Sequence, residues 1–169
     1  MEKRKYIKKV ALLGEGAVGK TSLVRRYVLD VFSDDYIQTF GAKVTKKVLE
    51  MESVELTMMI WDILGQKSNS SLHSTYYSGS NGALLVFDLT RPETLEAIPR
   101  WLDDLKKVTG NIPFILVANK ADLHKEIAQE RMDQISSQLN TTMMFTSAKN
   151  GTGVDEAFMQ LSLKMMGGV

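Results

Sequence analysis

One eight-residue stretch constrains this chain more than any other, Gly14-Glu15-Gly16-Ala17-Val18-Gly19-Lys20-Thr21. It matches the pattern G-x-x-x-x-G-K-[ST] at every fixed position, between an apolar run that ends at residue 13 and a helix-like run over residues 22–29. The three glycines permit backbone angles that a side chain would forbid, so that successive N–H groups can turn inward around a phosphate. The alternative is a glycine-rich turn before a helix, but the Lys-Thr ending favours a phosphate-binding loop.

Each part of this loop has an expected role. Lys20 would reach the β- and γ-phosphates of a nucleotide as a point charge, and the Thr21 hydroxyl would hold Mg²⁺. Backbone N–H groups at the positive end of the following helix would bind further phosphate oxygens. The predicted nucleotide-binding residues of the loop are Gly14, Glu15, Gly16, Ala17, Val18, Gly19, Lys20, Thr21 and Ser22.

Composition limits the other functions of the chain. Its 169 residues suit one domain over 1–169, and a chain of this length buries roughly 70% of its unfolded surface. A formal net charge of +1 predicts neither a nucleic-acid nor a membrane partner. Cysteine is absent, which excludes disulfides, zinc–thiolate sites, a thiol nucleophile and a prenyl or palmitoyl anchor on the chain as written. No apolar run approaches about 18 residues, and the start Met-Glu-Lys-Arg-Lys is not a secretion signal, so we expect a cytoplasmic protein. We also expect a monomer without a lipid anchor.

Apolar runs and amphipathic runs alternate along the whole length. Consecutive apolar residues predict buried strands, and apolar residues three and four apart predict helices. The predicted strands are residues 7–13, 43–51, 55–61, 82–88, 112–118 and 143–145, with the second and third paired as an antiparallel hairpin. The predicted helices are residues 20–29, a short one ending at 77, one that follows residues 90–93, 125–139 and 154–165.

This alternation predicts an α/β fold, in which a mostly parallel sheet lies between layers of helices and ligands bind at the carboxyl ends of the strands. One helix start carries a more specific signature. Thr90-Arg91-Pro92-Glu93 fits a capping box, with Thr90 as the N-cap and proline near the helix start.

A second signal, Asn119-Lys120-Ala121-Asp122, follows the predicted strand 112–118. The Asp122 carboxylate can accept two N–H groups, which guanine presents on one edge, whereas adenine presents an acceptor there. A buried mismatch of this kind costs roughly 1–3 kcal/mol. Asn119 can brace the surrounding loops, and the Lys120 stem can lie over the base. The alternative is a polar helix-capping turn, but the position after a phosphate loop favours guanine recognition.

Two weaker signals have the same placement at strand ends. Ser147-Ala148-Lys149 follows the strand 143–145, and the Ala148 N–H could bind the guanine carbonyl oxygen, although an ordinary turn fits equally well. The second of these signals is the pattern D-x-x-G, formed by Asp62 and Gly65 directly after the predicted strand 55–61. Asp62 can hold a magnesium-bound water, Gly65 can bring its N–H to a γ-phosphate, and Gln66 can orient an attacking water.

Together these residues resemble the Ras superfamily of small GTPases, most nearly its Rab branch. The resemblance extends over residues 6–166. It is carried by GEGAVGKT at 14–21, TFG at 39–41, WDILGQ at 61–66, NKAD at 119–122 and SAK at 147–149. The runs LLVFDLTRPETL at 84–95 and GTGVDEAF at 151–158 also look like this family.

The resemblance implies a three-layer P-loop NTPase G domain with a six-stranded, mostly parallel sheet and five helices. It implies that residues 30–41 form switch I and residues 62–77 form switch II. Thr39 would then contact both Mg²⁺ and the γ-phosphate, and Phe32 would lie edge-on to the guanine. The alternative for Phe32 is a loop aromatic that covers the core.

The resemblance also implies a mechanism in which GTP and Mg²⁺ hold both switches and hydrolysis to GDP releases them. Gln66, Lys20 and Thr39 are the expected catalytic residues. Neither switch segment contains an arginine, and Arg25 and Arg26 lie on the first helix. We therefore expect slow intrinsic hydrolysis, an arginine supplied by a GTPase-activating protein, and an exchange factor and effectors at the switches.

Two departures from the family pattern leave alternatives open. Leu64 stands where the family has a small residue, and Lys67 where it has an acidic one. Leu64 favours a pseudo-GTPase that binds GTP without significant turnover, whereas Gln66 and Thr39 favour an active switch. A phosphate-loop kinase or ATPase is a further alternative, against which the NKAD sequence argues.

Overall fold

The computed structural model describes residues 2–32, 42–63 and 70–167, and at 70–73 the backbone only. The strands are β1 (Arg4–Leu13), β2 (Ala42–Glu50), β3 (Val54–Ile63), β4 (Gly82–Asp88), β5 (Phe114–Asn119) and β6 (Met143–Phe145). The helices are α1 (Lys20–Leu29), α2 (Ser70–Tyr77), α3 (Pro92–Glu96), α4 (Ile98–Thr109), α5 (Gln129–Gln138) and α6 (Val154–Met165). Strand and helix alternate as the sequence predicted, except at the hairpin of β2 and β3 and at the consecutive helices α3 and α4.

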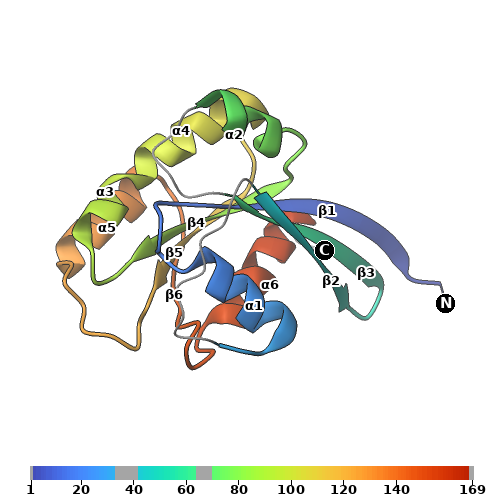
Figure 1. The fold of residues 1–169 in the computed structure, drawn as a ribbon. Helices are drawn as coiled ribbons and strands as arrows, with labels where there is room; N and C mark the ends of the chain where they lie inside the picture. Colours follow the sequence, from blue (N-terminus) through green and yellow to red (C-terminus); the bar gives the residue numbers. More distant parts are fainter. Residues whose placement is uncertain (1, 33–41, 64–69, 168–169) are drawn as a thin grey trace.

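The six strands form one sheet in the order β2-β3-β1-β4-β5-β6. All neighbouring pairs are parallel except β2 and β3, which pair antiparallel from Ala42 opposite Ile63 to Glu50 opposite Glu55. The predicted hairpin and the α/β fold class with a six-stranded, mostly parallel sheet are therefore confirmed. Helices α1 and α6 cover one face of the sheet, and α2, α3, α4 and α5 lie on the other (Figure 1).

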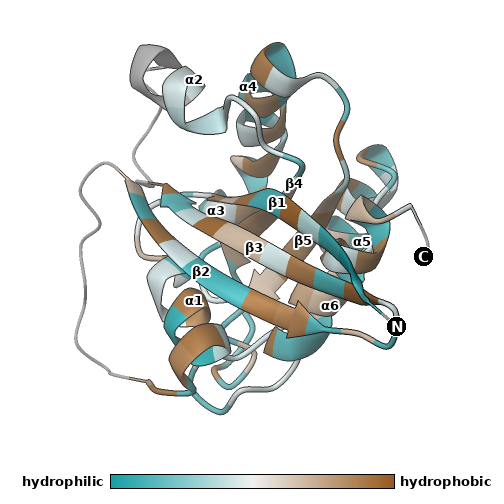
Figure 2. Ribbon diagram, turned by 90° about the vertical axis from the view of Figure 1, so that its right-hand side faces the viewer, coloured by the Kyte–Doolittle hydropathy of each residue, from teal (hydrophilic) through white to brown (hydrophobic). Residues whose placement is uncertain are grey.

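Each face of the sheet has its own hydrophobic cluster. One joins the sheet to α1 and α6 and includes Tyr27 stacked on Phe158, and the other packs α4 and α5 around Trp101. Every residue of β4 is buried, whereas β2 is mostly exposed or half-buried. Figure 2 shows the same contrast, with hydrophilic residues along β2 and at the start of β1. The central strands thus form the rigid base from which the loops at their carboxyl ends project.

Three local predictions were wrong. Thr90 is not a helix N-cap, because its hydroxyl donates to the buried Asp88 carboxylate at 2.7 Å and the helix begins at Pro92, with Arg91 as the N-cap. The helix predicted after it is divided into α3 and α4 near Pro99, which has no N–H to donate to the carbonyl four residues earlier. The helix predicted from residue 125 begins only at Gln129, because residues 125–128 approach β4 and the Glu126 N–H donates to the Leu89 carbonyl.

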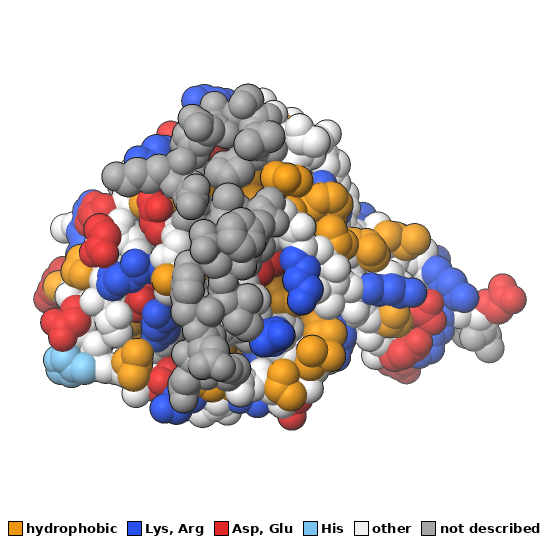
Figure 3. Space-filling view, viewed as in Figure 1, with side chains coloured by type: hydrophobic (Ala, Val, Ile, Leu, Met, Phe, Trp, Pro, Cys, Tyr) orange, Lys and Arg blue, Asp and Glu red, His pale blue; other side chains and the backbone are white. Residues whose placement is uncertain are grey.

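No helix in the described part of the chain is long and apolar enough to cross a membrane. On the face shown in Figure 3, basic and acidic side chains are interspersed.

Candidate functional site

Residues that the sequence singled out meet at one edge of the sheet, where parallel strands end. The phosphate-binding loop follows β1, Asp88 ends β4, Asn119 ends β5, and Thr146 follows β6. Because these strands are neighbours in the sheet, the four loops that follow their carboxyl ends adjoin one another (Figure 1). This is where α/β sheets of this kind bind ligands.

The backbone of the phosphate-binding loop requires glycine at Gly14 and at Gly19. Gly14 has φ 146°, and a Cβ there would lie 2.2 Å from the Val86 carbonyl oxygen. Gly19 has φ 102°, and a Cβ there would lie 2.3 Å from Nδ2 of Asn119. Between these two glycines, the left-handed conformation belongs to Ala17, at φ 62°, which the sequence did not predict.

Side chains bind the outward-facing carbonyls of this loop. Five successive carbonyl oxygens, from Gly14 to Val18, each accept a hydrogen bond of 2.6–3.1 Å. The donors are Lys20 to the first two, then Arg91, Lys120 and Asn119 in order along the loop. In a trans peptide the C=O and the following N–H point in opposite directions. Carbonyls held outward therefore leave the N–H groups directed toward the other side, as an anion-binding nest requires.

Lys20 is buried within this loop. Burial lowers the pKa of Lys20 to about 8, although the nearby carboxylates of Asp62 and Glu15 act in the opposite direction. The Glu15 carboxylate itself pairs with Arg100, at 3.0 Å. A buried ammonium of this kind is stabilised by an anion, so the loop fits a nucleotide phosphate by charge as well as by backbone geometry.

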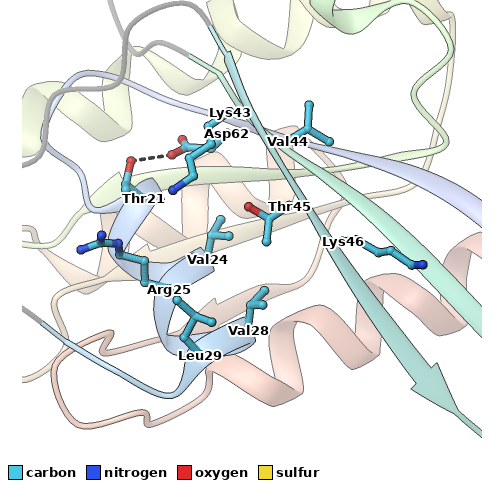
Figure 4. A pocket seen from close by; sticks show the side chains of 10 residues that line it. All are labelled: Thr21, Val24, Arg25, Val28, Leu29, Lys43, Val44, Thr45, Lys46 and Asp62. Carbon is cyan, nitrogen blue, oxygen red and sulfur yellow. Dashed lines mark hydrogen bonds between the residues drawn. The ribbon is translucent and has the colours of Figure 1, made fainter.

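Thr21 and Asp62 bring two hard oxygen donors together beside the loop. The Thr21 hydroxyl donates to the Asp62 carboxylate at 2.5 Å, from the first turn of α1 to the end of β3 (Figure 4). They lie at one end of a groove of about 330 Å³ between α1 and β2, where Lys43 is the register partner of Asp62. A hydroxyl and a carboxylate suit Mg²⁺, which commonly takes few protein ligands and completes its shell with phosphates and water.

The base-binding loops are connected to the phosphate-binding loop through Asn119. Its side chain is buried, donates to the Val18 carbonyl at 2.9 Å and accepts from the Thr146 hydroxyl at 2.9 Å. The prediction that Asn119 braces the loops is therefore confirmed. The Ser147 hydroxyl donates to the Asp122 carboxylate at 2.7 Å, which orients an exposed side chain next to the buried Ala148.

Several residues that position the site were not predicted. Arg91 contacts the phosphate-binding loop and pairs with Asp88, whereas the sequence predicted Arg91 only as part of a capping box. Thr146 holds Asn119, and Arg26 donates to the carbonyls of Ala148 and Lys149, at 2.8 and 2.5 Å. The one available signal was Asp88, a charged residue that ends an otherwise apolar run.

The remaining predicted residues lie either outside the described residues or at the edge of the site. Thr39, Gly65 and Gln66, and the departures at Leu64 and Lys67, lie outside the described residues. Ser22 lies in the first turn of α1. Phe32 is half-buried and packs against the hydrophobic cluster on the α1 and α6 face. This contact agrees with the alternative for Phe32, a loop aromatic that covers the core.

Comparison with known proteins identifies the family. Residues 9–167 match the model of the Ras family. The chain belongs to this family. It is 38% identical over 166 residues to "Ras-related protein Rab-21" of Bos taurus and of Homo sapiens, an alignment that covers 96% of this chain and 75% and 74% of those relatives. It is also 38% identical over 156 residues to "Ras-related protein RABA4b" of Arabidopsis thaliana, covering 90% of this chain and 70% of the relative.

This Ras-family chain is therefore a Rab-like small GTPase, and the resemblance seen in its motifs is confirmed. Proteins of the family bind GTP and GDP with Mg²⁺ and hydrolyse GTP. A further relative, "GTP-binding protein YPTM2" of Zea mays, is 33% identical over 160 residues and carries nucleotide binding in its name.

Proposed function

We propose that this chain, as one G domain over residues 1–169, is a GTP-operated molecular switch with slow intrinsic hydrolysis. The observation that carries the proposal is the linked pair of loops, in which Asn119 joins the clamped phosphate-binding loop to the strand ends that would hold the base. Such a link would keep a phosphate site and a base site at a fixed separation, so that one nucleotide could occupy both.

The phosphate-binding loop would hold the nucleotide by charge and by its N–H groups. Lys20 would turn from the carbonyls of Gly14 and Glu15 to the β- and γ-phosphates, where an ammonium stabilises charge that develops during transfer. Because Lys20 is buried, this interaction takes place away from bulk water and is correspondingly strong.

Thr21, Asp62 and Thr39 would hold Mg²⁺, with Asp62 acting through a water molecule. When bound, Mg²⁺ neutralises negative charge on the β- and γ-phosphates. The Thr21–Asp62 hydrogen bond keeps both oxygens in position for this role. Breaking it on metal binding would free both oxygens for the metal and its water.

Guanine would be selected by Asp122 and Ala148. Ser147 holds the Asp122 carboxylate, which would accept the two N–H groups on the guanine edge. The Ala148 N–H would donate to the guanine carbonyl oxygen, and Lys120 and Lys149 would lie against the base. Adenine would place an acceptor against the carboxylate, so GTP and GDP are the proposed ligands.

Hydrolysis would require residues 39 and 65–66. Gln66 would orient the attacking water, and the N–H groups of Thr39 and Gly65 would contact the γ-phosphate. Loss of the γ-phosphate would release switch I (30–41) and switch II (62–77). Effectors, an exchange factor and a GTPase-activating protein would recognise these two segments. With no arginine in either switch, we expect the activating protein to supply one and accelerate the reaction about 10³–10⁵-fold. Action in the cytoplasm as a monomer is part of the same proposal.

The first experiment identifies the nucleotide bound to the purified protein and then follows single-turnover hydrolysis of reloaded GTP. We expect bound GDP and slow turnover that is lost in Gln66→Leu. Fast turnover of the isolated protein would contradict the requirement for a partner. GTP that remains intact in both proteins, with an arginine-supplying activator added, would instead support the pseudo-GTPase, and reverting Leu64 to a small residue would test its cause. Competition by ATP as strong as by GDP would contradict guanine selection.

A further inference from the structure

Arg91 lies three residues beyond the carboxyl end of β4, and its side chain reaches the phosphate-binding loop. It is the residue just before α3, and its Nη2 donates to the Gly16 carbonyl oxygen at 2.6 Å. Its Nε donates to the Asp88 carboxylate at 3.2 Å, so the guanidinium is fixed at two points. The Arg91 side chain is 37% exposed, whereas the Asp88 side chain is 1% exposed. The buried Asp88 carboxylate therefore holds Arg91 against the middle of the phosphate-binding loop.

Asp88 gathers further donors that fix its position. It accepts hydrogen bonds from the N–H and the hydroxyl of Thr90, at 2.8 and 2.7 Å, and it pairs with Lys120 at 2.8 Å. Burial opposes ionisation of Asp88, but the hydrogen bonds from Lys120 and Thr90 outweigh it and hold its pKa below the usual value. The carboxylate therefore stays ionised and holds two cations side by side.

These two cations act on successive peptide units. Arg91 binds the carbonyl of Gly16, and Lys120 binds the carbonyl of Ala17 at 3.0 Å. Because each peptide is trans, the N–H of Ala17 points away from Arg91, and the N–H of Val18 points away from Lys120. Ala17, between the two peptides, has φ 62°, a conformation that costs a residue with a side chain roughly 1–2 kcal/mol. The pair of cations stabilises this strained conformation.

We propose that Asp88 and Arg91 form a positioning pair, which holds the Gly16–Ala17 peptide so that the Ala17 N–H faces the phosphate chain of a bound guanine nucleotide. The inference rests on the function proposed above and adds a residue to it. Arg91 does not touch the nucleotide, and it determines how long the nucleotide is retained.

The test measures release of fluorescent GDP and GTP from Arg91→Ala in the presence of Mg²⁺. A hydrogen bond from a charged donor corresponds to about tenfold or more in an equilibrium constant, and Lys120 continues to hold the neighbouring peptide, so we expect about tenfold faster release of both nucleotides. Arg91→Lys retains a donor but cannot bridge both partners as a planar fork does, and should release nucleotide at an intermediate rate. It also serves if the alanine variant does not fold.

The matched control is Arg131→Ala. Arg131 is also paired with a carboxylate, that of Glu96 at 2.6 Å, but it lies on α5 with both side chains exposed. We expect its release rates to equal those of the unmodified protein. Two further measurements separate positioning from general loosening of the fold. The amide resonance of Ala17 in the GDP-bound protein should shift in Arg91→Ala, and added guanidinium ion should slow release from Arg91→Ala, whereas sodium chloride at the same ionic strength should not.

Release from Arg91→Ala at the rate of Arg131→Ala, with an unmoved Ala17 resonance, would overturn the positioning role and leave the proposed switch intact. An unmodified protein that binds no guanine nucleotide would overturn the proposed function itself. The two failures are therefore distinguishable within one set of measurements.

Discussion

The phosphate end and the base end of the candidate site are held in different ways. At the phosphate end, side chains from three parts of the chain donate to backbone carbonyls, and the ligand would meet backbone N–H groups. At the base end, Arg26 fixes the backbone of residues 148–149, and the group proposed to select guanine is the side chain of Asp122, which is exposed and oriented by Ser147.

This difference separates what is common to nucleotides from what distinguishes them. Phosphates are the same in every nucleoside triphosphate, and a backbone nest can bind them without any particular side chain. In the proposed function, base identity depends in contrast on one replaceable side chain on a loop, that of Asp122. Substitutions at the phosphate end should therefore act mainly on folding and on all nucleotides, and substitutions at the base end on the choice among them.

The largest effect is expected for Gly14→Ala. The added Cβ would lie 2.2 Å from the Val86 carbonyl oxygen, on a backbone with φ 146°. Because Val86 belongs to the buried strand β4 and Gly14 directly follows β1, neither atom can move far. We expect a loss of roughly 3 kcal/mol or more in the free energy of unfolding, or about 6–12 °C in Tm, together with loss of bound nucleotide.

Gly79→Ala is the matched control for Gly14→Ala. Gly79 also has a positive φ, of 79°, but an added Cβ would meet no atom within 4 Å. It should cost only the conformational penalty, about 1 kcal/mol, and leave nucleotide binding unchanged. Thermal unfolding followed by circular dichroism compares the two variants, and equal losses would contradict the role assigned to the collision.

The sequence predicted most of the fold and which segments lie at the two ends of the candidate site, for reasons visible in particular residues. The uninterrupted apolar run of β4 indicates a parallel sheet, and the motifs at the strand ends indicate its binding edge. Strands β4 and β6 and helix α1 have the bounds predicted. These features depend on neighbouring residues and so can be recognised within a short window of sequence.

The positioning residues could not be predicted in the same way. Arg91 lies 75 positions from Gly16 along the chain, and Arg26 lies 122 positions from Ala148. Such partners are set by the order of strands in the sheet, which determines which loops adjoin. The same cause explains the wrong capping box, because a buried carboxylate at Asp88 competes for the Thr90 hydroxyl.

A smaller but more specific effect is expected for Asp122→Asn. An amide cannot accept both N–H groups of guanine, whereas its NH₂ group can donate to a carbonyl of xanthine. We expect affinity for GDP to fall by about 10- to 100-fold, affinity for xanthosine diphosphate to rise, and Tm to remain nearly unchanged because Asp122 is exposed. Competition binding with the two diphosphates measures the change.

Asp133→Asn controls for the loss of an exposed carboxylate elsewhere. Asp133 accepts a hydrogen bond from Gln129 on the surface of α5, at 3.0 Å, and its substitution should alter neither affinity. If Asp122→Asn kept its preference for guanine over xanthine, base selection would have to reside in another group, and the contrast between the two ends of the site would be lost.

The smallest effect is expected for Arg26→Met, which removes two hydrogen bonds from the base end and leaves the phosphate-binding loop untouched. Each bond contributes about 0.5–1.5 kcal/mol, and part of this is recovered by water at a half-exposed site, so GDP should dissociate about three- to tenfold faster. Arg25→Met is the control, because Arg25 lines the groove beside β2 and lies on the same helix (Figure 4). Hydrogen exchange at residues 147–149 should accelerate in Arg26→Met, while exchange at residues 14–19 should not change. Faster exchange in both segments would mean that Asn119 transmits the disturbance between the ends, and that they are held as one unit rather than two.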